Sequence, residues 1–295
     1  MRVFLTGATG FIGSAIIPEL ISAGHQVLGL TRSDAGAQSL MAAGAEVHRG
    51  DLEDLESLRD GAAKSDGVIH CAFDHNFANF VANCAKDKRA IEALGAALAG
   101  SNRPLVITSG TGMGSGAPGK PATEDVFNTG HPNPRIATEM TGAAMLAEGI
   151  NVSVMRLPQV HDTVKQGFVS YAVALTREKR VSAYVGDGRN RWPAAHVSDV
   201  ARLYRLALEK REPGARYNAV AEEGIAVRDV AEVIGRGFGV PVVSLSPEQA
   251  PGHFGWLAPY AGMDLPASSA QTRERLGWQP TGPGLIADLQ AMNYG

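Results

Sequence analysis

The feature that most constrains this chain is a glycine-rich turn that begins at its sixth residue. Residues 2–6 read RVFLT, a short apolar run typical of a buried parallel strand, and TGATGFIG follows at 6–13. Gly7, Gly10 and Gly13 thus stand at the head of a segment with helical spacing. A helix N-terminus attracts phosphate, and glycine lets the phosphate approach the backbone. An ordinary tight turn is the alternative, but strand, turn and helix together favour a phosphate site.

The first half of the chain alternates short apolar runs with helical patterns. Strands are expected at 2–6, 26–30, 45–48, 67–70, 104–108 and 151–156, and helices at 11–23, 35–43, 52–59, 76–99 and 134–148. This alternation predicts an α/β fold of Rossmann type, a doubly wound parallel sheet with right-handed crossovers. We expect a dinucleotide-binding domain at 1–156 and a smaller substrate-binding region at 157–295. Part of that region, around 196–210, is expected to return to the first domain.

Composition excludes several classes of protein. The net charge of −3 at pH 7 gives no electrostatic footprint for nucleic acid. The two cysteines, Cys71 and Cys84, have no CxxC spacing, so we expect neither a disulfide framework nor a metal site. No apolar run reaches the ~18 residues that a membrane span needs. No basic segment precedes the first strand, so we expect a cytoplasmic protein without a membrane partner.

Four motifs together resemble the extended and atypical short-chain dehydrogenase/reductases, the NAD-dependent epimerase/dehydratase group. They are TGATGFIG, HRGDL at 48–52, VIHCAF at 68–73 and HVSDVA at 196–201. The resemblance implies a Rossmann fold, a nicotinamide dinucleotide and a homodimer that packs through the long helix near Phe77, Phe80 and Val81. By the family's pattern, the cofactor-binding residues are Gly7, Thr9, Gly10, Phe11, Ile12, Gly13, Asp51, Leu52, Cys71, Ala72, Phe73, Ser109 and Pro158.

The end of the second expected strand indicates which dinucleotide binds. An acidic residue there would hydrogen-bond the ribose hydroxyls of NAD, but this chain has Thr31, Arg32 and Ser33. Arg32 can pair with a 2′-phosphate and Ser33 can donate a hydrogen bond to it, so we expect NADP. The alternative is that Arg32 is a solvated loop charge and that Asp34 serves NAD.

The resembled family uses a tyrosine and a lysine four residues later, and this chain lacks that pair. None of its 6 tyrosines has lysine at the fourth position after it. Spacing from the sixth expected strand places Arg135 and Glu139 in those two positions. Arg135 can stabilise a developing oxyanion, and Glu139 can carry a proton if it is buried. A surface ion pair between them is the alternative. Ser109 matches the family's serine after the fifth strand, and Thr111 is an alternate hydroxyl.

Four residues are candidate substrate contacts. His131 and His161 flank the expected site and titrate near neutrality, although a lone histidine is more often a satisfied structural residue. Arg191 and Trp192 follow a GDG turn and offer a cation and an aromatic face. The alternative is that Arg191 pairs with a nearby carboxylate and that Trp192 belongs to the core.

Three functions remain open at this point. The first is an NADP(H)-dependent oxidoreductase that passes hydride to a small carbonyl, imine or activated alkene, with the proton supplied by water. The second is an NAD-dependent epimerase or dehydratase on a sugar-type substrate, which needs a strong base. The third is a non-catalytic redox sensor. HFGWLAPY at 253–260 forms either the wall of a substrate pocket or the core of the second region.

Overall fold

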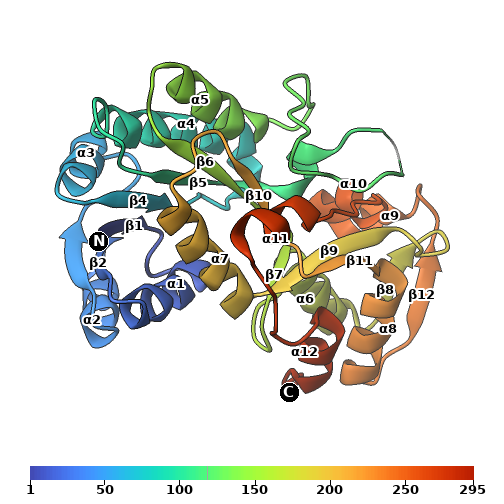
Figure 1. Cartoon of the computed structure of the whole chain (residues 1–295). Helices are drawn as coiled ribbons and strands as arrows, with labels where there is room; N and C mark the ends of the chain where they lie inside the picture. Colours follow the sequence, from blue (N-terminus) through green and yellow to red (C-terminus); the bar gives the residue numbers. More distant parts are fainter. Residues whose placement is uncertain (118) are drawn as a thin grey trace.

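Seven parallel strands form the main sheet of the computed structural model, which describes residues 1–117 and 119–295 (Figure 1). They are β1 (Arg2–Thr6), β2 (Gln26–Thr31), β3 (Glu46–Arg49), β4 (Gly67–His70), β5 (Leu105–Gly110), β6 (Val152–Leu157) and β10 (Arg216–Asn218). Their order is β10-β6-β5-β4-β1-β2-β3. The order reverses between β1 and β4, which creates the switch point where ligands bind in open α/β sheets. The predicted α/β fold of Rossmann type is confirmed.

Helices cover both faces of this sheet (Figure 1). One face carries α1 (Phe11–Ser22), α2 (Asp34–Ala42) and α7 (Val197–Lys210), and the other α3 (Leu55–Ala63), α4 (Phe80–Ala96) and α5 (Ile136–Ala147). Val3 and Leu5 of β1 pack into the first apolar cluster and Phe4 into the second, because side chains alternate along a strand. Helix α7 and strand β10 follow residue 157, so the later part of the chain contributes to the main sheet and its cover.

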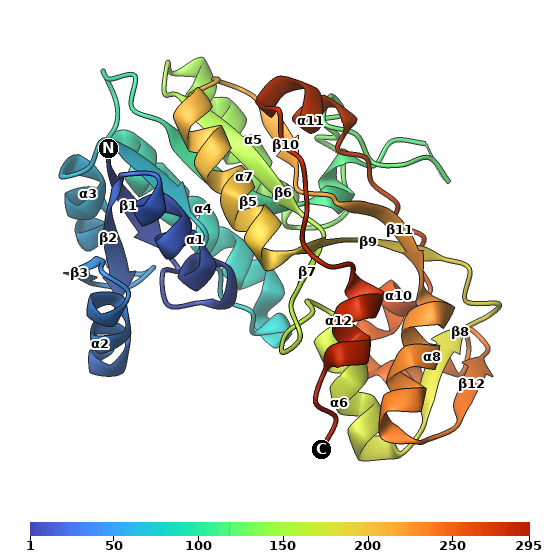
Figure 2. The same cartoon turned by 60° about the horizontal axis from the view of Figure 1, so that its bottom comes forward.

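The remaining elements form a smaller unit (Figure 2). One sheet holds β7 (Gln159–His161), β9 (Arg191–His196) and β11 (Glu222–Ala226), and another holds β8 (Ser182–Val185) and β12 (Val242–Leu245). Its helices are α6 (Val169–Lys179), α8 (Val227–Phe238), α9 (Ala250–Phe254), η3 (Gly255–Leu257), α10 (Ala258–Ala261) and α12 (Leu285–Ala291), whereas α11 (Ala270–Leu276) contacts α7 and β10 of the main sheet. The division of the chain at 156 stays a prediction.

Two expected helices begin later than their sequence pattern indicates. The long helix expected at 76–99 is a short 3-10 turn, η1 (Phe77–Asn79), followed by α4. The helix expected at 52–59 begins at Leu55, because the Asp54 side chain accepts a hydrogen bond from the Ser57 amide and caps it. A second 3-10 turn, η2 (Thr111–Gly114), follows β5. In the described part of the chain, no helix is long and apolar enough to cross a membrane.

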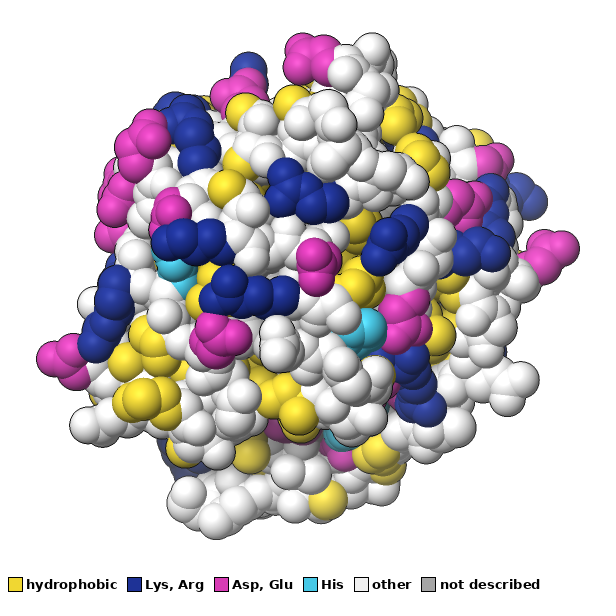
Figure 3. All heavy atoms as spheres, turned by 60° about the vertical axis from the view of Figure 1, so that its left-hand side comes forward, with side chains coloured by type: hydrophobic (Ala, Val, Ile, Leu, Met, Phe, Trp, Pro, Cys, Tyr) yellow, Lys and Arg dark blue, Asp and Glu magenta, His cyan; other side chains and the backbone are white. Residues whose placement is uncertain are grey.

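Basic and acidic side chains are interspersed on the face shown in Figure 3, which looks from the side of β2, α2 and α3. Several of these charges pair with one another. Arg2 lies 2.6 Å from Glu46, and Lys64 lies 2.5 Å from Asp60.

Candidate functional site

The glycine loop follows β1 at the switch point and touches the residues after β4. Gly7 has a φ of +68°, and a Cβ placed on it would lie 2.8 Å from the backbone nitrogen of Ala72. A Cβ on Gly13 would lie 2.1 Å from the Gly7 carbonyl oxygen, so α1 starts in contact with the loop. Gly10 precedes α1 and supplies no side-chain cap, which leaves the first N–H groups of the helix without one. These features fit a diphosphate.

The other residues that the family pattern assigns to the cofactor lie after neighbouring strands of the main sheet. Asp51 and Leu52 follow β3, Cys71 to Phe73 follow β4, and Pro158 follows β6. The Asp51 carboxylate accepts hydrogen bonds from the Glu53 and Asp54 amides at 2.7 and 3.2 Å and orders the turn before α3. Burial raises the pKa of the Cys71 thiol to about 11, so it stays protonated at neutral pH. Its role as a cofactor contact stays a prediction.

The end of β2 presents a free guanidinium. Arg32 is exposed and has no ion-pair partner within the described residues. Ser33 caps α2 by accepting a hydrogen bond from the Gly36 amide at 3.1 Å, and its hydroxyl hydrogen is not used in that contact. Asp34 lies 2.6 Å from Arg49. Asp34, the carboxylate that would serve NAD, is therefore paired with Arg49, whereas Arg32 has no acidic partner among the described residues.

Arg135 immediately precedes α5 and enters a polar network that its sequence spacing did not predict. Its Nη1 lies 2.9 Å from Asp87 Oδ2, although without hydrogen-bond geometry, and its Nη2 donates to the Thr108 carbonyl at 2.8 Å. The guanidinium carbon lies 3.8 Å from the centroid of the Phe73 ring. The side chain is 13% exposed, so it is held in place but still reachable. A guanidinium has five N–H donors, so Arg135 retains some for a ligand.

Asp87, fully buried on α4, links Arg135 to the glycine loop. Its Oδ1 lies 3.2 Å from His70 Nε2, and Thr138 donates to its Oδ2 at 2.6 Å. His70 Nδ1 in turn lies 2.8 Å from Thr6 Oγ1, in the last residue of β1. Burial alone would raise the pKa of Asp87, but Arg135 and the hydrogen bonds from His70 and Thr138 hold it below its usual range. Asp87 is therefore a carboxylate at neutral pH.

Glu139 contacts other arginines than Arg135, so the surface ion pair that the sequence left open as an alternative does not form. Its Oε1 accepts hydrogen bonds from Arg156 Nε at 2.8 Å and Ser109 Oγ at 2.9 Å. Its Oε2 accepts from Arg156 Nη2 at 2.7 Å and Arg216 Nε at 3.2 Å. These partners lie on β5, β6 and β10. The face of α5 that carries Glu139 therefore packs against the main sheet. With both oxygens occupied, Glu139 has no free position for exchanging a proton with a substrate, and the proton of Ser109 is committed to it.

Three of the predicted substrate contacts have structural partners instead. His161 is buried, with Nδ1 2.7 Å from Asp288 Oδ2. Trp192 is 2% exposed and packs in the core of the smaller unit. Arg191 donates to Asp264 through Nε at 3.0 Å and Nη2 at 2.8 Å. These are the alternatives that the sequence left open, and none of the three residues enters the site proposed below.

The loop before α5 positions His131 near Arg135. His131 Nδ1 accepts a hydrogen bond from the Asn133 amide at 3.1 Å, and Asn133 Oδ1 accepts one from the Arg135 amide at 2.9 Å. Burial lowers the pKa of His131, with Glu139 opposing the shift, so the imidazole is neutral at pH 7. His131 thus helps to order the loop before α5.

Thr111, the alternate hydroxyl after β5, is 6% exposed at the start of η2.

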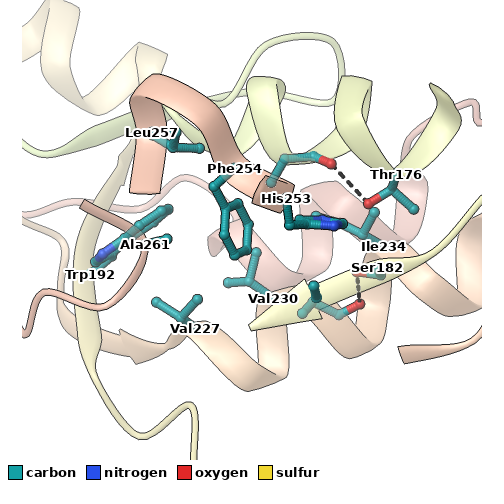
Figure 4. Close-up of a pocket in the computed structure, with 13 residues that line it drawn as sticks. Thr176, Ser182, Trp192, Val227, Val230, Ile234, His253, Phe254, Leu257 and Ala261 are labelled. Carbon is teal, nitrogen blue, oxygen red and sulfur yellow. Dashed lines mark hydrogen bonds between the residues drawn. The ribbon is translucent and has the colours of Figure 1, made fainter. Parts of the chain in front are cut away.

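An interior cavity of the smaller unit is separate from this site (Figure 4). It measures about 20 Å³, which is room for a single water molecule. Apolar side chains such as Val230, Ile234 and Phe254 line it, together with Trp192 and His253. Its lining includes no residue of the glycine loop or of the strand ends beside that loop. We therefore place the candidate site at the switch point.

Comparison with known proteins identifies the class. A profile of the NAD dependent epimerase/dehydratase family matches residues 3–220. An uncharacterised protein of Schizosaccharomyces pombe is 45% identical over 295 residues, which cover 100% of both chains.

Two further relatives have named activities. A 4-hydroxy-2-methyl-3-oxo-4-farnesyl-3,4-dihydroquinoline-1-oxide ketoreductase of Stigmatella aurantiaca is 26% identical over 74% of this chain and 67% of its own. The structure of Thermus thermophilus UDP-glucose 4-epimerase in complex with NAD has a TM-score of 0.76 at 20% identity, over 100% of this chain and 98% of that one. The chain belongs to the NAD-dependent epimerase/dehydratase family.

Proposed function

We propose that the chain is an NADP(H)-dependent oxidoreductase that passes a hydride to a small carbonyl, imine or activated alkene. The observation that carries this proposal is Arg135, whose side chain is 13% exposed and whose guanidinium lies beside Phe73 with Nη1 free of any hydrogen bond in the described structure. The glycine loop would hold the diphosphate, and the segment Cys71–Phe73 would line the cofactor at the switch point. The family profile supports a nicotinamide cofactor, and the ketoreductase relative supports reduction of a carbonyl group.

Arg135 supplies electrostatic stabilisation in the proposed reaction. NADPH held by the glycine loop would supply a hydride with its electron pair and would become NADP⁺. As the hydride reaches a carbonyl carbon, the π pair of the C=O bond moves onto oxygen, and preorganised donors stabilise that charge. Arg135 stays protonated, so it stabilises the oxyanion without giving up a proton. Water then supplies the proton that completes the alcohol.

The alternative, epimerisation of a sugar-type substrate, needs a base that takes a hydroxyl proton. Glu139 and Ser109 are committed to one another and to the arginines around them. Tyr204 reaches the same strands, with its Oη 2.7 Å from Thr108 Oγ1, but it is fully buried. Burial raises its pKa well above 10.0, so it is a poor base at neutral pH. The geometry of these residues therefore favours reduction over epimerisation.

The function is tested by following NADPH absorbance while a panel of aldehydes, ketones, quinones and imines is added to the purified protein. We expect substrate-dependent oxidation of NADPH and release of the cofactor after each turnover. UDP-glucose serves as the competing substrate. Its conversion by protein that retains NAD would establish the epimerase instead. Saturable NADPH binding without turnover of any panel member would establish the redox sensor.

The NADP preference predicts an unequal effect of Arg32→Ala on the two cofactors. Loss of a charged hydrogen-bonding partner of the 2′-phosphate is expected to weaken NADPH binding about 10- to 100-fold. NADH has no such phosphate, so its affinity should change less than about 2-fold. Titration calorimetry on both cofactors measures the difference. Arg59→Ala, which removes a half-buried arginine of α3 that pairs with Glu56, is the control and should leave both affinities unchanged. Equal losses in Arg32→Ala would contradict the preference.

We also propose a homodimer that packs through α4 and α5. These helices lie side by side on one face of the sheet (Figure 1). They expose three large apolar side chains, Val81, Met140 and Leu146, which are 69%, 47% and 37% exposed. Apolar side chains on adjacent helices are the kind of surface that a two-fold interface covers.

A further inference from the structure

A series of aromatic side chains begins at Arg135 and crosses to the smaller unit. Phe73 lies against the Arg135 guanidinium, and its ring centroid lies 6.1 Å from that of Phe80. Phe80 is followed by Phe77 at 5.8 Å. Phe77 then stacks on Trp256 of η3, with ring centroids 4.5 Å apart and planes tilted by 13°. The segment between β4 and α4 is thereby joined to the smaller unit by stacked rings.

Aromatic side chains around α6 and α10 continue the series on the far side. The ring centroid of Phe168 lies 6.0 Å from both Phe77 and Trp256, and 5.0 Å from Tyr260. Tyr171 meets the Trp256 ring edge-on at 4.9 Å. We call this set the aromatic enclosure; it consists of Phe73, Phe77, Phe80, Phe168, Tyr171, Trp256 and Tyr260.

Tyr260, at the other end of the series, lies next to Asn133, which is hydrogen-bonded to Arg135. Burial raises the pKa of the Tyr260 hydroxyl, and the adjacent Asn133 amide opposes that shift. Asn133 Oδ1 also accepts the hydrogen bond from the Arg135 backbone amide. Phe73 at one end of the series therefore contacts the Arg135 guanidinium directly, and Tyr260 at the other end is linked through Asn133 to the Arg135 backbone, so the aromatic side chains adjoin the Arg135 segment.

The charged groups beside the Phe73–Phe80 end of the enclosure are paired or neutral. Lys86 lies 3.1 Å from Asp74 and 3.5 Å from Glu53. Burial and the Arg135 charge lower the pKa of His75, so it is neutral at pH 7. A sugar diphosphate would find no unpaired cation among these groups. A flat uncharged molecule would instead gain ring contacts worth ~0.5–1.5 kcal/mol each beyond its area burial.

We propose that the aromatic enclosure is the substrate subsite and that it takes a flat, uncharged aromatic carbonyl compound whose oxygen reaches Arg135. This inference rests on the proposed reductase function and adds the substrate class to it. Trp256 is 43% exposed and Tyr171 38%, so the Phe77–Trp256 stack faces solvent. A planar substrate enters by separating these two rings, since stacked rings leave no gap for a third.

The experiment compares two carbonyl probes in steady-state NADPH oxidation. Phenanthrenequinone is flat, aromatic and uncharged, whereas glyceraldehyde is small and aliphatic. Trp256→Ala is expected to raise KM for phenanthrenequinone about 10-fold or more, as loss of one or two aromatic contacts predicts. Its kcat/KM for glyceraldehyde should stay within about 2-fold. Met263→Ala removes a side chain that is 47% exposed in the same unit but outside the enclosure, and it should change neither probe.

A binding measurement separates the subsite from the reaction. Of the 3 tryptophans, Trp192 and Trp278 are buried, so Trp256 reports on the enclosure by fluorescence. Saturable quenching by phenanthrene, which has no carbonyl, is expected in the wild type and should weaken in Phe77→Ala.

Binding of phenanthrene without turnover of any carbonyl would overturn the proposed function and leave the subsite standing. Turnover of both probes with unchanged KM in Trp256→Ala would overturn the subsite and leave the function standing.

Discussion

Replacing Glu139 with glutamine is expected to lower the free energy of unfolding by about 3–5 kcal/mol, the usual cost of breaking a buried ion pair. The change removes the carboxylate that receives two hydrogen bonds from Arg156 and one from Arg216. Arg156 is fully buried, so its guanidinium would be left in the interior without a counter-charge. For a chain of this size the midpoint of thermal unfolding should fall by roughly 10 °C.

Circular dichroism during heating measures this effect, with Glu56→Gln as the matched control. Glu56 pairs with Arg59 three residues later on α3, but its side chain is 85% exposed, so the same chemical change should leave the midpoint unchanged. Equal midpoints for the two variants would contradict a structural role for Glu139. Well below its midpoint, Glu139→Gln should also keep most of the wild-type turnover, because both oxygens of Glu139 are used to hold α5 against the sheet.

The fold of the first half follows from local patterns, and that of the second half does not. Buried parallel strands such as β1 and β5 are continuous apolar runs, which the sequence displays directly. Strands of the smaller unit lack this signal. Strand β9 contains Pro193, which usually argues against a strand, and β11 reads EEGIA and pairs at only one edge. Their pairing depends on contacts between distant segments.

The phosphate loop could be predicted because its parts adjoin in sequence, whereas the partners of Arg135 and Glu139 could not. Both lie at the start of α5, and helical spacing suggested that they pair. The structure instead directs them to α4 and to the sheet, a choice that depends on packing. Asp87 did leave a signal: it follows Asn83 by four residues and precedes Ala90 by three, on the buried face of α4. A carboxylate on a helix face whose other buried residues are mostly apolar needs a buried partner.

Replacing Arg135 with methionine should lower kcat about 100- to 1000-fold, the usual effect of removing one donor to a developing oxyanion. The KM for NADPH should change only slightly, because the diphosphate contacts remain. Arg135→Lys keeps the charge but loses the planar fork, so it should recover only part of the rate. Arg89→Met, at an exposed position on α4, is the control. A wild-type kcat in Arg135→Met would mean that another group stabilises the oxyanion.

Asp87→Asn tests whether the buried carboxylate positions Arg135. The side chain keeps its size but loses its charge, so Arg135 should become less well held, and kcat should fall while the KM for NADPH changes little. The pKa of Asp87 is lowered in the folded protein, so its carboxylate contributes stability above about pH 4 that is lost as the pH falls through the lowered pKa.

The variant should therefore be less stable than the wild type at neutral pH, and the difference should shrink in acid. Unfolding midpoints measured from acid to neutral pH show this convergence. A constant difference across that range would mean that the charge of Asp87 is not what stabilises the network, and an unchanged kcat would show that it does not position Arg135.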